Sequence, residues 1–176
     1  MKTSEELERQ ATLQVAALMV AAARTAPKTR GIDNIKTAMI DDELARQKVI
    51  AKMCEIATKE NRPSFARDAG SIENSPAMVV IGVESNAAGL NCGFCGKPTC
   101  EVLEAAGGVC AFNSIDLGIA TTSAAEVAGR FHIDNRVMYS MGRACLDLGI
   151  FGPKVKRALG IPLSVTGKNP FFDRKT

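Results

Sequence analysis

Four cysteines within 19 consecutive positions are the feature that most constrains this 176-residue chain. A 4Fe-4S cluster can be held by four thiolates, because each iron of the cube accepts one protein sulfur. Gly93 and Gly96 lie among these cysteines, and glycine readily adopts the backbone angles that wrapping a chain around a compact group requires. The spacing Cys-x2-Cys-x4-Cys-x9-Cys therefore predicts a 4Fe-4S cluster with four ligands, namely Cys92, Cys95, Cys100 and Cys110.

Two other interpretations of the same four cysteines remain open. A zinc ion can take four thiolates in a tetrahedron and serve only to hold a loop together. Structural zinc sites usually combine two closely spaced pairs of ligands, whereas here nine residues separate Cys100 from Cys110. This spacing favours a 4Fe-4S cluster over zinc, and it favours either metal centre over four reduced thiols without a ligand.

The N-terminal sequence and the hydropathy pattern indicate a cytoplasmic protein. The longest unbroken apolar run, Val15 to Ala23, has nine residues, well below the roughly 20 that a membrane-spanning helix needs. The first residues, Met-Lys-Thr-Ser-Glu-Glu-Leu, carry acids where a signal peptide carries an apolar stretch. We therefore expect no membrane association, and cytoplasmic thiols more often bind metal or act in catalysis than form disulfides.

The charge balance argues against nucleic acid as a partner. The chain has 22 Lys and Arg against 19 Asp and Glu, a net charge of +3, with no Trp, one Tyr and seven Phe. Nucleic-acid binders carry a strongly basic surface, and those that bind single strands add aromatic stacking platforms. His132 is the single histidine of the chain, so we expect neither a Ser-His-Asp triad nor a two-histidine metal site.

Hydrophobic periodicity predicts an α+β fold that is mostly helical with a small sheet. With 46% hydrophobic residues, the chain fits a single domain over 1–176, with a cysteine-rich segment at 86–112 inserted in it. Helices are expected from the Thr3 capping box to about Arg24, from an Asp41 cap to about Glu60, over Ile115–Ala128, from an Asp134 cap to Leu148, and from Pro153 to about Leu159.

Two strands are expected, one at Ala77–Val83 and one at Ile161–Thr166. The first is a continuous apolar run and therefore a buried strand, whereas Pro162 places the second at a sheet edge or at the start of a strand. The aromatic tail over 167–174 is expected to dock on the domain.

Several residues outside the four-cysteine motif allow a structural and a functional interpretation. The helix expected at 115–128 is rich in small residues, which would let another backbone or a flat cofactor come close. Cys54 and Cys145 lie on apolar helix faces, so we expect them to be packing residues. A basic loop could form a phosphate cradle or remain solvated, and its polar residues are Arg24, Lys28, Thr29 and Arg30.

The cysteine stretch and several segments after it resemble the prokaryotic family of ferredoxin domain-containing proteins. The resemblance covers most of the chain from about Arg24 onward and rests on 91–100, 110–120, 134–136 and 160–169. It implies a cluster-binding domain and no particular reaction. The stretch also resembles the Cys-Gly-x-Cys-Gly-x-x-x-Cys motif of Rnf-type electron-transfer and corrinoid iron-sulfur proteins, in which the last cysteine lies further downstream than Cys110 does.

A second resemblance is to the flavin-dependent nitroreductases. Ala-Arg-Thr-Ala-Pro at 23–27 and Leu-Gly-Ile-Pro at 159–162 are similar to stretches of that family, and the small-residue helix lies where the family has its central dimer helix. The resemblance implies an α+β homodimer that binds FMN. The arginine-rich motif that grips the flavin phosphate in that family is not evident here, so its place would fall to Arg24, Lys28, Arg30 and Lys168.

These observations give a leading functional hypothesis and two alternatives. The leading one is a cytoplasmic 4Fe-4S protein that passes single electrons to a redox partner protein or a flavin. The first alternative is an FMN-dependent oxidoreductase of nitroreductase-like fold that is fed by the cluster, and the second is an interaction domain held together by zinc. If the protein is an enzyme, the sequence predicts an oxidoreductase.

Overall fold

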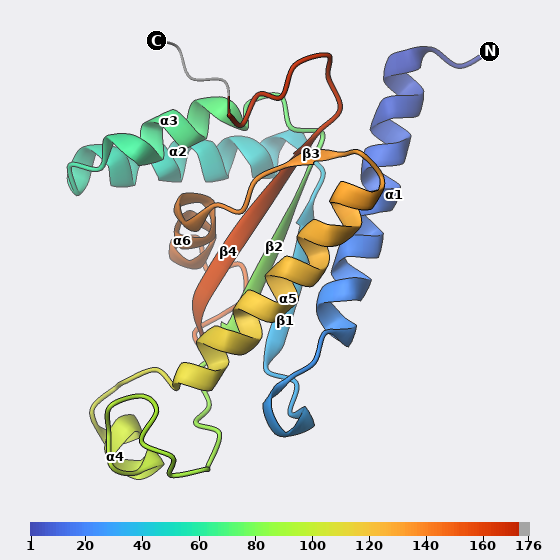
Figure 1. The fold of residues 1–176 in the computed structure, drawn as a ribbon. Coiled ribbons are helices and arrows are strands. Elements are labelled where there is room, and N and C mark those ends of the chain that lie inside the picture. Colours follow the sequence, from blue (N-terminus) through green and yellow to red (C-terminus); the bar gives the residue numbers. More distant parts are fainter. Residues whose placement is uncertain (173–176) are drawn as a thin grey trace.

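The structure is a computed structural model that describes residues 1–172. A four-stranded sheet with helices on both faces forms its centre, so the predicted α+β class with a small sheet is confirmed (Figure 1). The helices are α1 (Ser4–Thr25), the 3-10 turn η1 (Thr29–Gly31), α2 (Glu43–Lys59), α3 (Pro63–Ser71), α4 (Cys100–Ala105), α5 (Ala111–Arg130) and α6 (Tyr139–Asp147). The strands are β1 (Ile35–Ile40), β2 (Ala77–Glu84), β3 (Asp134–Asn135) and β4 (Val155–Ser164).

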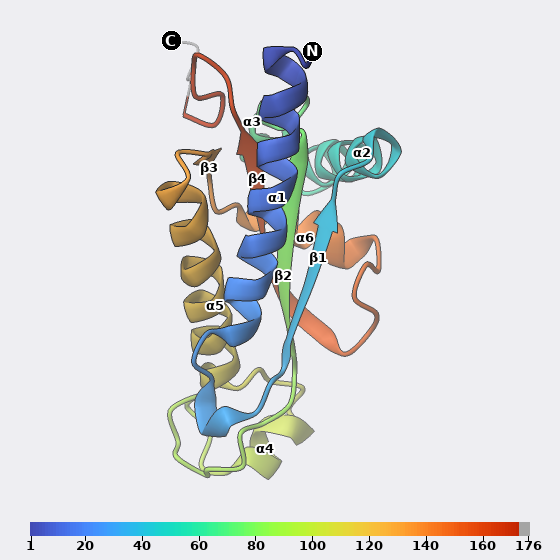
Figure 2. The same cartoon turned by 90° about the vertical axis from the view of Figure 1, so that its right-hand side faces the viewer.

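The sheet has the order β1-β2-β4-β3, and all neighbouring strands are antiparallel. Strand β2 lies in the middle and is buried along almost its whole length, as its continuous apolar sequence predicts. Its alternate side chains enter two separate cores. Val79 and Ile81 pack with α1 and α5 on one face, and Met78 and Val80 pack with α2, α3 and α6 on the other (Figure 2).

Several predicted elements are confirmed by the structure. Helix α1 begins at the Thr3 capping box, in which the Thr3 hydroxyl accepts a hydrogen bond from the Glu6 N–H and the Glu6 carboxylate accepts one from the Thr3 N–H. Helices α2 and α5 lie close to their expected places, with Asp42 rather than Asp41 as the cap of α2. In the tail, Phe171 is buried in the second core and Phe172 is exposed, while residues 173–174 of the predicted docking segment lie outside the described part.

Near the C-terminus the predicted elements are partly wrong. The helix expected from Pro153 to Leu159 is instead the first half of β4, because pairing with the central strand β2 outweighs the local helix signals. The expected Asp134 cap is also wrong. Asp134 begins the short strand β3, its carboxylate accepts a hydrogen bond from the Asn169 amide at 2.9 Å, and the helix that follows begins only at Tyr139.

Strand β4 is not an edge strand, although it contains Pro162. The N–H and C=O of Gly160 both bond to Met138, on the β3 side of the strand. Backbone groups two residues apart in a strand point to the same side. Pro162, which lacks an N–H, therefore also faces the β3 side. There it lies between the bridge of Gly160 to Met138 and the pair of Leu163 with Asn135. The hydrogen bonds between β4 and β2 therefore lose no donor.

Strand β1 and helix α3 were not predicted. Pro63 starts α3 instead of only ending the preceding helix.

The cysteine-rich segment projects from one end of the sheet. It leaves β2, carries the short helix α4 and returns into α5, while the N-terminus lies at the opposite end (Figure 1). None of the helices within residues 1–172 is long and apolar enough to cross a lipid bilayer.

Candidate metal centre

The four clustered cysteines come from three local structures at this end of the sheet. Cys92 and Cys95 lie in the loop before α4, Cys100 is the first residue of α4, and Cys110 is the N-cap of α5. Thr99 caps α4 by accepting a hydrogen bond from the Val102 N–H at 3.3 Å. The two helix starts therefore fix the last two cysteines, and the loop carries the first two.

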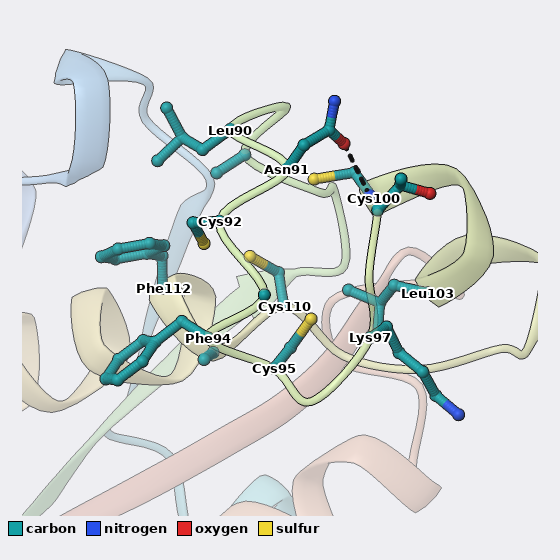
Figure 3. Close-up of a pocket in the computed structure, with 14 residues that line it drawn as sticks. Leu90, Asn91, Cys92, Phe94, Cys95, Lys97, Cys100, Leu103, Cys110 and Phe112 are labelled. Carbon is teal, nitrogen blue, oxygen red and sulfur yellow. Dashed lines mark hydrogen bonds between the residues drawn. The ribbon is translucent and has the colours of Figure 1, made fainter.

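All four cysteines line one pocket at this end of the sheet. Their sulfurs are turned toward the space that the loop encloses (Figure 3). Cys110 is buried at the base of the cavity, Cys95 and Cys100 are half-buried, and Cys92 is exposed. The structure thus brings together the four residues that the sequence singles out as ligands.

The backbone of the loop before α4 uses the left-handed conformation at four positions, which are Gly89, Asn91, Gly93 and Gly96. Gly93 and Gly96 have φ values of 71° and 78°, and the Gly96 N–H donates to the Gly93 carbonyl at 2.8 Å. Asn91 also has a positive φ, of 47°, and its side-chain oxygen accepts a hydrogen bond from the Cys100 N–H at 2.8 Å. The role of Gly93 and Gly96 was predicted from the sequence and that of Asn91 was not, although asparagine is among the few residues that tolerate this conformation.

Apolar side chains form one wall of the cavity. The rings of Phe94 and Phe112 lie 5.7 Å apart between centroids, and Leu103 is 4% exposed (Figure 3). Val102 and Val109 are not among the residues that line the pocket. Lys97 lines the cavity and turns its ammonium group away from the sulfurs. The site is therefore sheltered on the side of α5 and open on the side of the loop.

Two buried polar side chains of α5 tie the start of this helix to neighbouring loops. The Asn113 amide donates to the carbonyls of Glu84 and Asn86, at 3.1 and 2.8 Å, where the chain leaves β2. The Asp116 carboxylate accepts from the N–H and the hydroxyl of Thr29, at 3.0 and 2.9 Å. Neither role was predicted from the sequence, because the partner of a polar residue on a helix is known only once the loops are placed.

The geometry of the four thiols bears on which metal they could hold. A zinc ion about 2.3 Å from each of four sulfurs would bring those sulfurs within about 4 Å of one another. Among residues 1–172, no three His, Cys, Asp or Glu side chains converge closely enough to hold a single ion. The four cysteines line one pocket, and thiolates are the usual ligands of iron-sulfur clusters. The donor set therefore fits an iron-sulfur cluster.

The four cations expected to bind a flavin phosphate lie in two places. Arg24, Lys28 and Arg30 lie at the end of α1 and in the turn that follows, whereas Lys168 lies in the loop after β4 at the opposite end of the sheet (Figure 1). Arg24 pairs with Asp33 at 2.6 Å, and Lys28 donates to the backbone carbonyls of Arg24 and Ala26. A single chain therefore does not bring the four cations together.

The two remaining cysteines have different surroundings. Cys145 lies fully buried on α6 in the second core, as expected for a packing residue, and burial raises the pKa of its thiol to about 12. Cys54 is exposed on α2, so the expectation that it packs is wrong. The apolar neighbours of Cys54 in the sequence face the core, and Cys54 lies on the outer side of the same helix.

Comparison of the fold with solved structures finds flavoenzymes of the nitroreductase family. A nitroreductase with bound FMN from Bacteroides fragilis superposes with a TM-score of 0.64 at 11% identity, over 93% of this chain and 82% of the other. A nitroreductase with bound FMN from Desulfitobacterium hafniense gives a TM-score of 0.62 at 16% identity, over 96% and 80% of the two chains. The resemblance to the nitroreductase fold is therefore confirmed at the level of the fold.

Comparison of the sequence identifies the family. Residues 106–174, which include Cys110 and begin after the other three clustered cysteines, match the family described as "Uncharacterized protein containing a ferredoxin domain (DUF2148)". An uncharacterized protein from Archaeoglobus fulgidus is 41% identical over 172 residues, which span 92% of this chain and 91% of that protein. The chain thus belongs to the family of uncharacterized proteins that contain a ferredoxin domain.

Proposed function

We propose that this protein binds a 4Fe-4S cluster through Cys92, Cys95, Cys100 and Cys110 and transfers electrons. The observation that carries the proposal is the single cavity that these four thiols line at one end of the sheet. Membership of a ferredoxin-domain family supports a redox function of this kind. When bound, such a cluster accepts and releases one electron at a time.

The residues around the thiols have separate tasks in this proposal. The left-handed Gly93 and Gly96 wrap the loop, and Asn91 ties it to the start of α4. Phe94 and Phe112 exclude water from one side, and solvent exposure is one of the factors that set the potential of an iron-sulfur centre. Phe94 is 65% exposed, so this aromatic wall also reaches the surface where a redox partner protein or a flavin would exchange electrons.

Two matched cysteine variants test the proposal. Cys95→Ser removes one thiol of the cavity, whereas Cys54→Ser removes an exposed thiol on α2. After anaerobic reconstitution with iron and sulfide, we expect Cys95→Ser to lose most of the visible absorption of the wild type and Cys54→Ser to keep it. Equal absorption in the two variants would contradict the ligand assignment. Binding of one zinc without sulfide would favour an interaction domain held together by zinc.

A second candidate function is a flavin-dependent oxidoreductase that the cluster supplies with electrons. Its support is the fold, which this chain shares with nitroreductases that have bound FMN. The proposed phosphate-binding cations Arg24, Lys28 and Arg30 lie far from Lys168, so a flavin site that used all four would need a second chain turned end to end. Titration of the purified protein with FMN tests this candidate, and the absence of flavin uptake would contradict it.

A homodimer accompanies both candidates in our proposal. The outer faces of α1 and α5 form a shallow groove with partly exposed apolar side chains, among them Ile115 and Ile119. Small residues of α5 such as Gly118 lie in the same groove and would let a helix of a second chain come close.

We place the protein in the cytoplasm, where thiols remain reduced and available as ligands.

A further inference from the structure

The turn between α1 and β1 contains an arginine in a conformation that arginine rarely adopts. Arg30 has a φ of 58° in η1, and Gly31 follows with a φ of 68°. A left-handed conformation costs little at glycine and considerably more at a residue with a Cβ atom. A strained backbone conformation of this kind often occurs where the side chain has to be held in one particular position.

The Arg30 side chain reaches the loop that leads into the cysteine cavity. Its Nη1 donates to the carbonyl of Ala88 at 2.7 Å, and Ala88 is one of the residues that line the cavity. The next residue, Gly89, has a φ of 70°, and a Cβ atom there would lie 3.2 Å from Arg30 Nη1. The loop therefore passes close to the guanidinium group, and it leaves room for the group by using a glycine.

The turn that carries Arg30 is itself fixed from the cysteine side. Asp116, buried on α5, accepts hydrogen bonds from the N–H and the hydroxyl of Thr29, the residue before Arg30. Asn34, just after the turn, accepts a hydrogen bond from the Asn86 amide at 2.9 Å. The turn and the entry loop thus form one hydrogen-bonded unit, and Arg30 contributes a positive charge to it beside the cavity wall.

We propose that Arg30 is a positioning residue of the metal centre, which holds the entry loop 86–91 and places a positive charge beside the cluster. The inference rests on the proposed function, because it needs a cluster in the cavity. It reassigns Arg30 from a flavin phosphate to the cysteine loop. Each reduction adds a negative charge to the centre, so a nearby cation stabilises the reduced form and raises the reduction potential.

The test compares three variants of the full chain after anaerobic reconstitution. Arg30→Gly removes the side chain without straining the turn, because glycine adopts the left-handed conformation readily. Arg30→Lys keeps the charge and loses the planar donor group. Arg130→Gln removes an exposed charge at the far end of α5, where Arg130 pairs with Glu126, and serves as the control. The measurements are the reduction potential of the cluster and the hydrogen exchange of the peptide that contains 86–91.

For Arg30→Gly we expect a more negative potential and about tenfold faster exchange of the loop, since a hydrogen bond from a charged donor is lost. Arg30→Lys should keep a potential close to that of the wild type, and Arg130→Gln should match the wild type in both measurements. Arg30→Gln replaces the glycine variant in the same comparison if that variant does not fold.

The outcomes separate the two proposals. If the wild type binds the cluster, and the Arg30→Gly variant has the same reduction potential and the same loop exchange as the wild type, the proposed role of Arg30 is overturned. The assignment of the cluster would then still stand. A wild-type chain that takes up no iron and sulfide would contradict the proposed function itself.

Discussion

The six cysteines of this chain differ in what surrounds them. Four share one cavity, Cys145 is enclosed in the second core with a thiol pKa raised to about 12, and Cys54 faces outward from α2. A thiol with a raised pKa is largely protonated at neutral pH and is therefore a poor metal ligand. At the scale of residues, spacing in the sequence was enough to identify the four candidate ligands, whereas the exposure of Cys54 depended on how α2 is turned.

Gly96 provides a prediction about the loop backbone. A Cβ atom at Gly96 would meet nothing within 4 Å, so the effect of Gly96→Ala comes from its φ of 78° alone. We expect the variant to destabilise the loop by about 1 kcal/mol and to lose iron to a chelator several-fold faster than the wild type. Gly70→Ala is the matched control, because a Cβ atom there also meets nothing but the backbone is helical. Equal rates of iron loss in both variants would contradict the role of Gly96.

At the scale of elements, the sequence predicted those with a clear local signal. The capping box gave the start of α1, and the continuous apolar run gave β2. Strand β4 was half predicted as a helix, because its first residues, Val155 to Leu159, are fixed by pairing with β2 and not by their own propensity. Strand β1 has the same origin, since Ile35–Ile40 has a mixed burial pattern and forms through its register with β2.

The polar anchors of the cysteine segment could not be predicted, because their partners are far away in the sequence. Asp116 bonds to Thr29, which lies 87 positions earlier, and Asn113 bonds to the end of β2. These residues make sense only when α5 lies beside both loops. The ligands of the candidate site were thus readable from the sequence, while the residues that hold the site in place were not.

Substitutions at Asp116 test whether this residue anchors α5 to the turn after α1. Asp116→Ala should lower the free energy of unfolding by roughly 1–3 kcal/mol, because the N–H and the hydroxyl of Thr29 lose their acceptor. Asp116→Asn keeps one acceptor oxygen and should lose less. Thr58→Ala removes a hydroxyl bond within α2 and should have little effect. Urea denaturation measures all three variants, and an Asp116→Ala variant as stable as Thr58→Ala would contradict the anchoring role.

At the scale of the whole molecule, the fold separates three regions. The cysteine segment lies at one end of the sheet and the N-terminus at the other (Figure 2). The groove lies between the C-terminal end of α1 and α5. A partner in that groove would contact α5, the helix whose first turn follows Cys110 directly. In the proposed homodimer, the interface and the metal centre therefore share one helix.

The homodimer is tested by a charge placed in the groove. Ile119 is 38% exposed there, and Ile119→Glu should raise the dissociation constant at least tenfold, because the carboxylate would be buried without a partner. Leu44→Glu introduces the same change at a leucine that is 68% exposed on α2, outside the groove, and should leave the assembly unchanged. Sedimentation velocity measures both variants. A wild type that sediments as a monomer, or an Ile119→Glu variant that remains a dimer, would contradict the proposed interface.

The central claim is that the four clustered thiols hold a 4Fe-4S cluster. The most direct measurement is anaerobic purification of the wild-type protein, followed by determination of iron, zinc and acid-labile sulfide and a visible spectrum on the same sample. We predict about four iron and four sulfide per chain, since each cube contains that number. One zinc per chain with no sulfide would contradict the claim and make the cysteine segment a structural zinc site.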